Sequence, residues 1–451
     1  MHTVLASLVF LSCVGGFVTG CSDDSDNSAG GGAGSGGSGS SGSGGSGGSG
    51  LGGQAGSGPG GSGGSGGSGG AGGSGGAGGA GGSGDAGDAG DAGDDVVASD
   101  CPAGNGTFAV QRVDGTSSEG ASLVVCGDLF GAVGPDIVLF ADMENGQPGE
   151  LVTGTPPIIG EWLGGGTLFA NDASRSGTMS MLVADTNIND GKGLGIKFGV
   201  PDASGAFGLK EFDEFFMSWA LRDLGDFPGN NSSPTSFSSD SSAKDIWMMF
   251  GDRGDNYDYS CSTGECNGND IVLATHTGQG SFKNDGNNTG TSWWLGSFWR
   301  FQTWNAMSAY MKIDPNDPYG SSTGVFEHVS AASAYRRDEY NSNLLKQLDG
   351  LDPVWDRFKF GAWYRTAGDV RRVMDDVYLA IGPGAAARVE IANAPQIESA
   401  TKIAVSTVDN WSNGRIEMTV RLGDLDPSAD SLYVFVVDAN NERSTGFPIN
   451  P

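Results

Sequence analysis

Basic residues are scarce in this chain, and its first 100 residues contain no Lys or Arg. Nine of the 54 acidic residues lie in that stretch, so residues 101–451 carry 45 acidic and 24 basic residues, a formal charge of −21. Nucleic acids and anionic membrane surfaces attract positively charged proteins, so this balance argues against both as partners. Strongly acidic polysaccharides are disfavoured too, unless a local basic groove exists.

Cys-x-x-Cys pairs are absent, and only His276 and His328 lie in the region after residue 100, which disfavours a zinc site. Four cysteines occur in that region, two flanking one segment (Cys101 and Cys126) and two bracketing a tight loop (Cys261 and Cys266). An even number in an exported protein indicates disulfides. Three ways of pairing these cysteines are open, and the local one, with the bridges Cys101–Cys126 and Cys261–Cys266, is favoured. The chain-entropy model assigns them ~3.5 and ~2 kcal/mol respectively.

No apolar run is long enough to span a bilayer, which takes about 20 residues. The apolar stretch Val4–Val18 is shorter than that and is followed by Val18-Thr19-Gly20-Cys21. This ending resembles the lipobox of bacterial lipoproteins, although the usual positive charges before the apolar stretch are missing. The resemblance implies that residues 1–20 are a signal peptide and that Cys21 is acylated. The protein would then be extracytoplasmic, lipid-anchored to the bacterial outer membrane or cell surface. A plain secretory signal is the alternative.

Residues 21–100 are predicted to be a disordered linker. Residues 28–93 are almost entirely Gly, Ser and Ala, with Asp entering at the end. Such a segment has nothing to bury and cannot offset its ordering entropy. As a flexible coil it would span ~45 Å, which makes it a spacer.

Short apolar and β-branched segments separated by Gly, Asn, Asp and Pro dominate the rest of the chain, which predicts an all-β fold. Only 341–350 looks helical. A change of composition near Ala394-Pro395 predicts a boundary between a large unit, 101–394, and a small one, 395–451, that ends in a hairpin with its turn at 439–441. The twelve predicted strands are 137–140, 177–183, 193–198, 215–222, 245–251, 271–277, 304–313, 357–366, 370–381, 402–407, 415–422 and 432–438.

The large unit resembles a known fold family. Its opening Phe140-Ala141-Asp142-Met143-Glu144 and its closing Met374-Asp375-Asp376-Val377-Tyr378 enclose two further strand motifs, 216–222 and 304–312. This layout resembles the concanavalin A-like lectin/glucanase jelly roll, which implies an exported carbohydrate-binding or carbohydrate-active protein. The tail, with its best strand at 432–438, resembles a small immunoglobulin-like module.

Tryptophans supply the main functional signal, because indole faces stack on sugar rings while the ring NH donates a hydrogen bond. Glycines flank 290–298, which predicts an exposed loop. On 304–313, alternation places Met307, Met311 and Ile313 in the core and leaves Trp304, Tyr310 and Lys312 on a face that could form a sugar platform. Most tryptophans of a sandwich fill its core, which is the alternative. The predicted carbohydrate-binding residues are Trp293, Trp294, Trp299, Trp304, Trp363 and Tyr364.

Enzyme chemistry on this fold is a second hypothesis. Hydrolysis needs two facing carboxylates, and the nearest match to the Glu-x-Asp-x-x-Glu strand of the laminarinase-like branch, 211–216, lacks the last acid. Elimination of uronic acid sugars is the other reaction that the resemblance implies. The candidate catalytic residues are His276, Tyr310, Lys312 and Arg300.

The resemblance also implies a structural calcium ion between the first and last jelly-roll strands, held by Asp142, Glu144 and Asp376. Solvated acids at strand ends are the alternative. No other cofactor is expected. The sequence thus predicts a surface lipoprotein that binds a polysaccharide or glycan and meets the membrane only through its lipid. A polysaccharide lyase or glycoside hydrolase, and an adhesive protein without a glycan ligand, remain alternatives.

Overall fold

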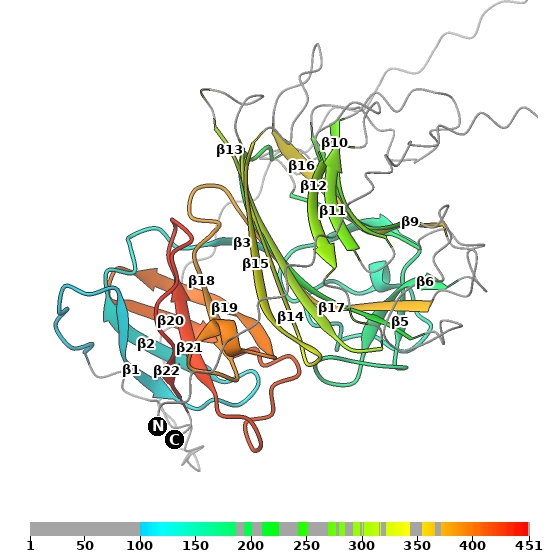
Figure 1. Cartoon of the computed structure of the whole chain (residues 1–451). Coiled ribbons are helices and arrows are strands. Elements are labelled where there is room, and N and C mark those ends of the chain that lie inside the picture. The colour runs from blue at the N-terminus through cyan, green and yellow to red at the C-terminus, as the bar shows by residue number, and fades with distance from the viewer. Residues whose placement is uncertain are drawn as a thin grey trace, which may run out of the picture. The chain divides into compact units, whose positions relative to one another are not determined.

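The computed structural model describes residues 100–185, 194–200, 210–224, 242–250, 269–276, 279–284, 292–297, 300, 302–314, 316, 322–342, 354–365 and 371–449. These residues belong to one compact unit, Asp95–Pro451, built from antiparallel strands (Figure 1). Their only helical turns are the 3-10 turns η1 (Val152–Gly154) and η3 (Ile397–Ser399). Within this described part, no helix is long and apolar enough to cross a membrane.

The strands form three sheets, called here the central sheet, the outer sheet and the module sheet. In order, the central sheet contains β15 (Ser333–Ser342), β14 (Ser322–Ser330), β13 (Asn305–Ile313), β8 (Glu214–Asp223), β17 (Arg371–Ile381), β6 (Ser180–Asp185) and β5 (Leu168–Ala170), with β3 (Asp136–Ala141) paired to β17. The outer sheet contains β12 (Ser292–Ser297), β11 (Gln279–Asn284), β10 (Asn269–His276), β9 (Ser242–Phe250), β16 (Trp355–Arg365), β7 (Ile196–Gly199) and β4 (Trp162–Gly165). The module sheet contains β1 (Ala109–Gly115), β2 (Ser122–Asp128), β20 (Arg415–Thr419), β19 (Ile403–Ser412), β18 (Arg388–Ala392), β21 (Tyr433–Val437) and β22 (Phe447–Pro448).

The central and outer sheets pack face to face as a jelly-roll sandwich, as the sequence predicts. Alternation along β8 sends Phe215, Met217, Trp219 and Leu221 into the core between them. Residues of β16 and β7 close that core from the outer sheet. Met307, Met311 and Ile313 of β13 lie in the same core, so their predicted orientation is confirmed.

The module sheet does not follow the predicted division of the chain. Its strands β1 and β2 come from the start of the predicted large unit, and β2 pairs with β20. The predicted boundary near Ala394-Pro395 falls between β18 and β19, which pair with each other. Composition along the chain could not reveal this, because the pairing joins residues almost 300 positions apart. Contacts of β1 with β21 and β22 show that the sheet folds over on its own apolar core.

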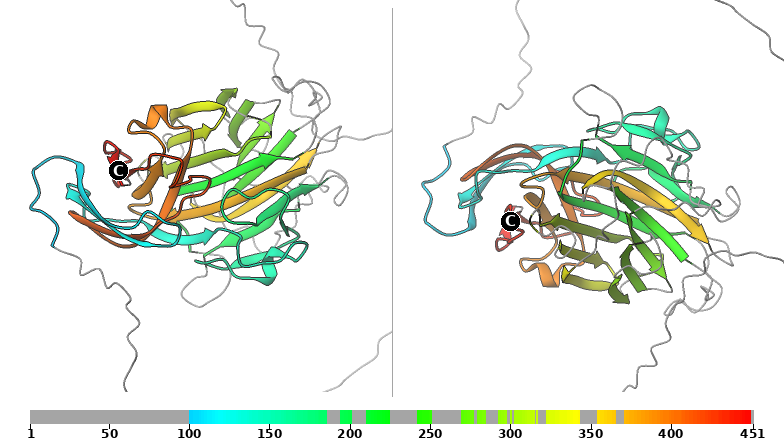
Figure 2. Two further views of the ribbon diagram at one scale, coloured as in Figure 1. Left: turned by 90° about the horizontal axis from the view of Figure 1, so that it is seen from below. Right: turned by 90° about the horizontal axis from the view of Figure 1, so that it is seen from above.

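Residues 100–135 and 382–449, which contain the module sheet, are called the module here. The module packs against the face of the central sheet that points away from the sandwich core. Ala385, Ala386 and Val405 of the module contact Phe216, Tyr310 and their apolar neighbours on that face. The two views in Figure 2 show the module strands lying beside the sandwich at one end of the unit. The predicted platform on β13 is therefore closed off, because Tyr310 is buried under the module. That prediction was wrong.

Charged side chains reinforce this contact. The Arg388 guanidinium lies 4.1 Å from the centre of the Phe216 ring and donates to Glu390 and to Glu327 of β14. Arg443 donates to both of these carboxylates as well. Burial opposes ionisation of Glu327, but Arg443 and Arg388 outweigh it and hold the Glu327 pKa below its ordinary value. The module is thus tied to the sandwich by ionised, buried pairs.

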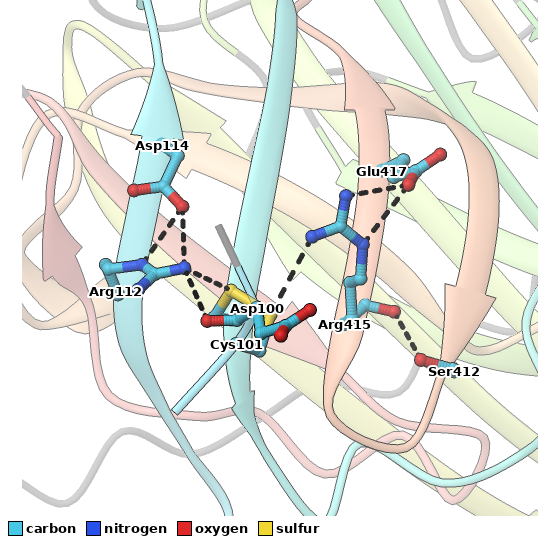
Figure 3. The surroundings of a disulfide bond; sticks show 8 residues. Asp100, Cys101, Arg112, Asp114, Ser412, Arg415 and Glu417 are labelled. Atoms are coloured by element: carbon cyan, nitrogen blue, oxygen red, sulfur yellow. Dashed lines mark hydrogen bonds and ion pairs between the residues drawn. A yellow bond between two sulfur atoms is a disulfide. The ribbon is translucent and has the colours of Figure 1, made fainter. Parts of the chain in front are cut away.

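A disulfide joins Cys101 to Cys126 with its sulfurs 2.04 Å apart, which confirms the predicted bridge. Figure 3 shows two arginines beside it, Arg112 on β1 and Arg415 on β20. Each of them also forms an ion pair with an acid on its own strand, Asp114 and Glu417 respectively. Cys261 and Cys266 lie outside the described residues, as do 343–350 of the predicted helix. The first two residues of that helix instead end β15.

Candidate ligand pocket

The connection from β12 to β13 is organised by one buried amide, that of Asn305. Its Nδ2 donates to the carbonyls of Arg300 (2.7 Å) and Thr303 (3.0 Å), and its Oδ1 accepts from the Arg300 backbone N–H (3.0 Å). His328 of β14 contacts the same Oδ1 through its Nε2 at 3.0 Å. Burial, aided by Arg300 and Arg336, lowers the pKa of His328 to about 3. A neutral imidazole therefore helps to fix this connection.

The connection presents two side chains at the end of the central sheet. Gln302 is exposed and has the left-handed φ of 58°, so the backbone turns sharply there. Trp304 is half-buried and donates its ring NH to the Ser174 carbonyl at 3.1 Å. Trp304 packs in an apolar cluster with Leu224 and Val373.

An open pocket of about 440 Å³ lies beside this cluster. It forms where β8 ends, β17 begins, and the loops before β6 and β13 approach. In Figure 1 this end of the sandwich, near β5 and β6, lies on the right, whereas β1, β2 and β22 lie on the left. The residues that line it are Asp172, Arg222, Asp223, Leu224, Gln302 and Arg371. All of them except Leu224 are polar or charged.

The carboxylates of the pocket are already bound by arginines. Arg371 donates two parallel hydrogen bonds of 2.7 Å to Asp172, and its Nε lies 3.3 Å from Asp185. Beneath the pocket, the buried Arg372 donates to Asp223 at 2.6 Å and also to Asp245 of β9. The second contact crosses from the central to the outer sheet. Such bidentate and buried pairs fix side-chain positions firmly.

Arg222 differs from these arginines. It is half-buried in the pocket wall, and within the described structure its Nε is buried without an acceptor. No ion pair or hydrogen bond to its guanidinium is found there either. Each neighbouring carboxylate is engaged with Arg371 or Arg372. The pocket therefore offers one guanidinium that no described protein carboxylate contacts.

The predicted carbohydrate-binding residues do not form one cluster. The backbone of Trp293 and Trp294 lies in β12, so the predicted exposed loop is an edge strand of the outer sheet. Trp363 and Tyr364 lie in β16 of that sheet, and Trp299 lies outside the described residues. Trp304 belongs to the central sheet side and adjoins the pocket. Proximity in sequence suggested a single patch, but the chain changes sheets between β12 and β13.

The four candidate catalytic residues do not converge either. His276 ends β10 in the outer sheet, whereas Tyr310 lies on the far face of the central sheet, with the sandwich core between them. The Tyr310 hydroxyl donates to Glu214 at 3.0 Å, and burial together with Glu214 raises its pKa. Lys312 pairs with the same Glu214 at 2.8 Å. Arg300 lies in the β12–β13 connection, where its backbone N–H and carbonyl bind Asn305. Among the side chains that the structure describes, Tyr310 and Lys312 are brought together on Glu214.

The predicted calcium ligands are bound by protein groups. Glu144 accepts hydrogen bonds from the backbone N–H groups of Thr178 and Met179. Asp376 pairs with Arg175 at 2.9 Å, and Asp142 lies 3.5 Å from Arg421. Among the described residues, no three His, Cys, Asp or Glu side chains are grouped so that they could hold a metal ion. The calcium ion stays a prediction.

Sequence reasoning missed the pocket itself, because its residues come from four separate parts of the chain. The doublet Arg371-Arg372 at the start of a strand was the one local signal, since two adjacent cations entering a β-strand need partners on both faces. Nothing in the sequence near Arg222 indicated that its guanidinium would lack an ion-pair partner among the described residues.

No protein-family model and no curated protein sequence matches this chain. Among solved structures, it is similar to lectin II from Ulex europaeus, with 12% identity over 48% of this chain and 93% of that one, and a TM-score of 0.29. An alginate lyase from Chlorella virus matches 42% of this chain and 76% of that one at 10% identity, with a TM-score of 0.26. A β-glucanase catalytic domain from Podospora anserina matches 55% and 86% at 9% identity, with a TM-score of 0.25. Likenesses this distant say nothing about what the present chain binds.

Proposed function

We propose that this protein binds a saccharide in the pocket at the end of the central sheet. The observation that carries the proposal is the composition of that pocket. Arginine and glutamine side chains supply donors, aspartates supply acceptors, and Leu224, which belongs to the same apolar cluster as Trp304, supplies apolar surface. A saccharide needs this mixture, because its hydroxyls both donate and accept and its ring faces are apolar.

The size of the pocket suits a small ligand. Its volume of about 440 Å³ falls within the range of roughly 300–1,000 Å³ that is usual for small-molecule sites. The arginine–aspartate pairs hold its polar groups in place before a ligand arrives, so little ordering entropy is lost on binding. An apolar ligand would displace water from these charged groups and offer them no hydrogen bonds in return, which disfavours it.

The setting of the site is also part of the proposal. The chain is inferred to be exported and anchored through a lipid on Cys21, with residues 21–100 as its tether, because of the apolar leader, the Cys21 motif and the Gly/Ser-rich composition. Immunoglobulin-like character of the module stays a prediction.

Catalysis is not proposed, because the candidate catalytic residues lie on different faces of the sandwich. The experiment that tests binding is affinity electrophoresis of the whole chain through a panel of polysaccharides, followed by titration calorimetry with oligosaccharides of any hit. Leu224→Trp should fill the pocket and abolish binding. Leu129→Trp is the matched control, since Leu129 is 48% exposed and lies in the module.

The proposal would be supported if a glycan retards the wild type and the Leu129→Trp variant but does not retard the Leu224→Trp variant. Equal loss in both variants, or equal binding in both, would refute the assignment to this pocket. The absence of binding to every glycan would favour an adhesive protein without a sugar ligand. Shortened products in the mixture would instead restore the enzyme hypothesis.

A further inference from the structure

Arg222 narrows the class of saccharide, provided that the proposed function holds. The Nε of Arg222 is buried without an acceptor, so this N–H has lost its contact with water and gained no partner in return, which costs stability. This unpartnered N–H lies in the wall of an open pocket, where a ligand can supply the missing acceptor. A carboxylate fits best, because its two oxygens match the planar fork of a guanidinium.

The surrounding charges limit how acidic the ligand can be. The two carboxylates that line the pocket, Asp172 and Asp223, are paired with Arg371 and Arg372. Asp185 and Asp245 add negative charge just beneath it. Residues 101–451 as a whole are strongly acidic. Arg222 can pair with one ligand carboxylate, whereas the excess of acidic groups around the pocket would repel a chain of carboxylates.

We propose that the pocket recognises a mostly neutral saccharide that carries a single carboxylate, with Arg222 as the anion-binding residue. Gln302 and Leu224 then contact the neutral part of the ligand. Hydrogen bonds to charged groups contribute more than neutral ones, so the carboxylate should improve affinity on the order of tenfold to a hundredfold. The preference should weaken in high salt, since an open pocket is partly screened.

Matched oligosaccharides test this with the whole chain. Three tetrasaccharides are compared on each of a glucose, a galactose and a mannose backbone. One is neutral, one has a single residue oxidised to the uronic acid, and one is uronic acid throughout. The singly acidic member of one backbone should bind most tightly to the wild type. Arg222→Gln should remove that preference while leaving affinity for the neutral member within about threefold. Arg415→Gln, which removes a paired arginine of the module, should change nothing.

Stability provides a second readout that does not depend on the ligand. Because Arg222 has no acceptor in the described structure, Arg222→Gln should leave the midpoint of thermal unfolding unchanged or raise it. Arg371→Gln, which breaks a bidentate pair, should lower it. A fall in the Arg222→Gln midpoint equal to that of Arg371→Gln would show that Arg222 is structural and would overturn the inference.

The outcomes separate the two proposals. Equal affinity for neutral and singly acidic members overturns the anion-binding role and leaves saccharide binding intact. Tightest binding of the fully acidic member overturns the charge limit. Failure of all nine compounds and of the polysaccharide panel overturns the proposed function itself.

Discussion

The Arg443 guanidinium of the module donates to both carboxylate oxygens of Glu327 in β14, each at 2.9 Å. Neither side chain is exposed, at 9% and 6%, so the pair is shielded from water. This contact joins the C-terminal part of the chain to the central sheet. We expect Arg443→Met to lower the free energy of unfolding by about 3–5 kcal/mol, because it removes one partner of a buried ion pair.

Urea unfolding followed by tryptophan fluorescence would measure that change. Arg336→Met is the matched control, since its ion pair with Asp338 is about one-third exposed and such pairs contribute about 0–1 kcal/mol. Similar losses in both variants would contradict the special role of the buried pair.

Stability should depend on pH through His328. Its pKa in the folded protein is about 3, below the ordinary value of 6.5. Below pH 6.5 the unfolded chain binds a proton that the folded chain does not accept until about pH 3. The free energy of unfolding should therefore fall as the pH drops across this window, by up to about 1.4 kcal/mol per unit.

His328→Gln keeps a donor for Asn305 and removes the titration. Its unfolding free energy should fall less between pH 6.5 and 5, the part of the window above most carboxyl titrations. The same slope as in the wild type would show that other groups cause the acid sensitivity.

Removal of the disulfide should destabilise the module. The Cys101→Ser, Cys126→Ala double variant opens a covalent loop of about 26 residues, which the chain-entropy model values at ~3.5 kcal/mol. Chemical denaturation with and without reductant would show it. Reductant should weaken the wild type and leave the double variant unaffected, and sensitivity of the double variant would point to another bridge.

Tyr310 should prove structural. Tyr310→Phe removes a buried hydrogen bond to Glu214 and should cost about 1–3 kcal/mol, with Lys312 still paired to that carboxylate. Glycan affinity should stay within twofold of the wild type in calorimetry. A large loss of affinity without a loss of stability would return Tyr310 to the functional site.

The sequence predicted the fold class well because alternation is a local property. All twelve predicted strands overlap observed ones, from β3 to β21. Short strands such as β5 were missed because three residues carry too little pattern. The module sheet was missed for another reason, since the pairing of β2 with β20 depends on contacts that no window along the chain contains.

The candidate site was harder to predict. Tryptophans close in sequence seemed to make one patch, but β12 and β13 belong to different sheets. Arg222 was singled out because its side chain has no ion-pair partner among the described residues. That absence can be recognised only when the positions of Asp172 and Asp223 are known. Residue type and spacing cannot supply that information.

The bridge between Cys101 and Cys126 also has a mechanical consequence. Cys126 lies in β2 between partners on both sides, Arg112 of β1 and Arg415 of β20. A pull on the chain ahead of Cys101 would pass through the sulfurs straight into β2, and the segment between the two cysteines would carry no load. The hairpin β1–β2 could not be peeled open from its end. A pull on the chain ahead of Cys101 would instead have to shear a strand held along both edges, which is the more resistant geometry.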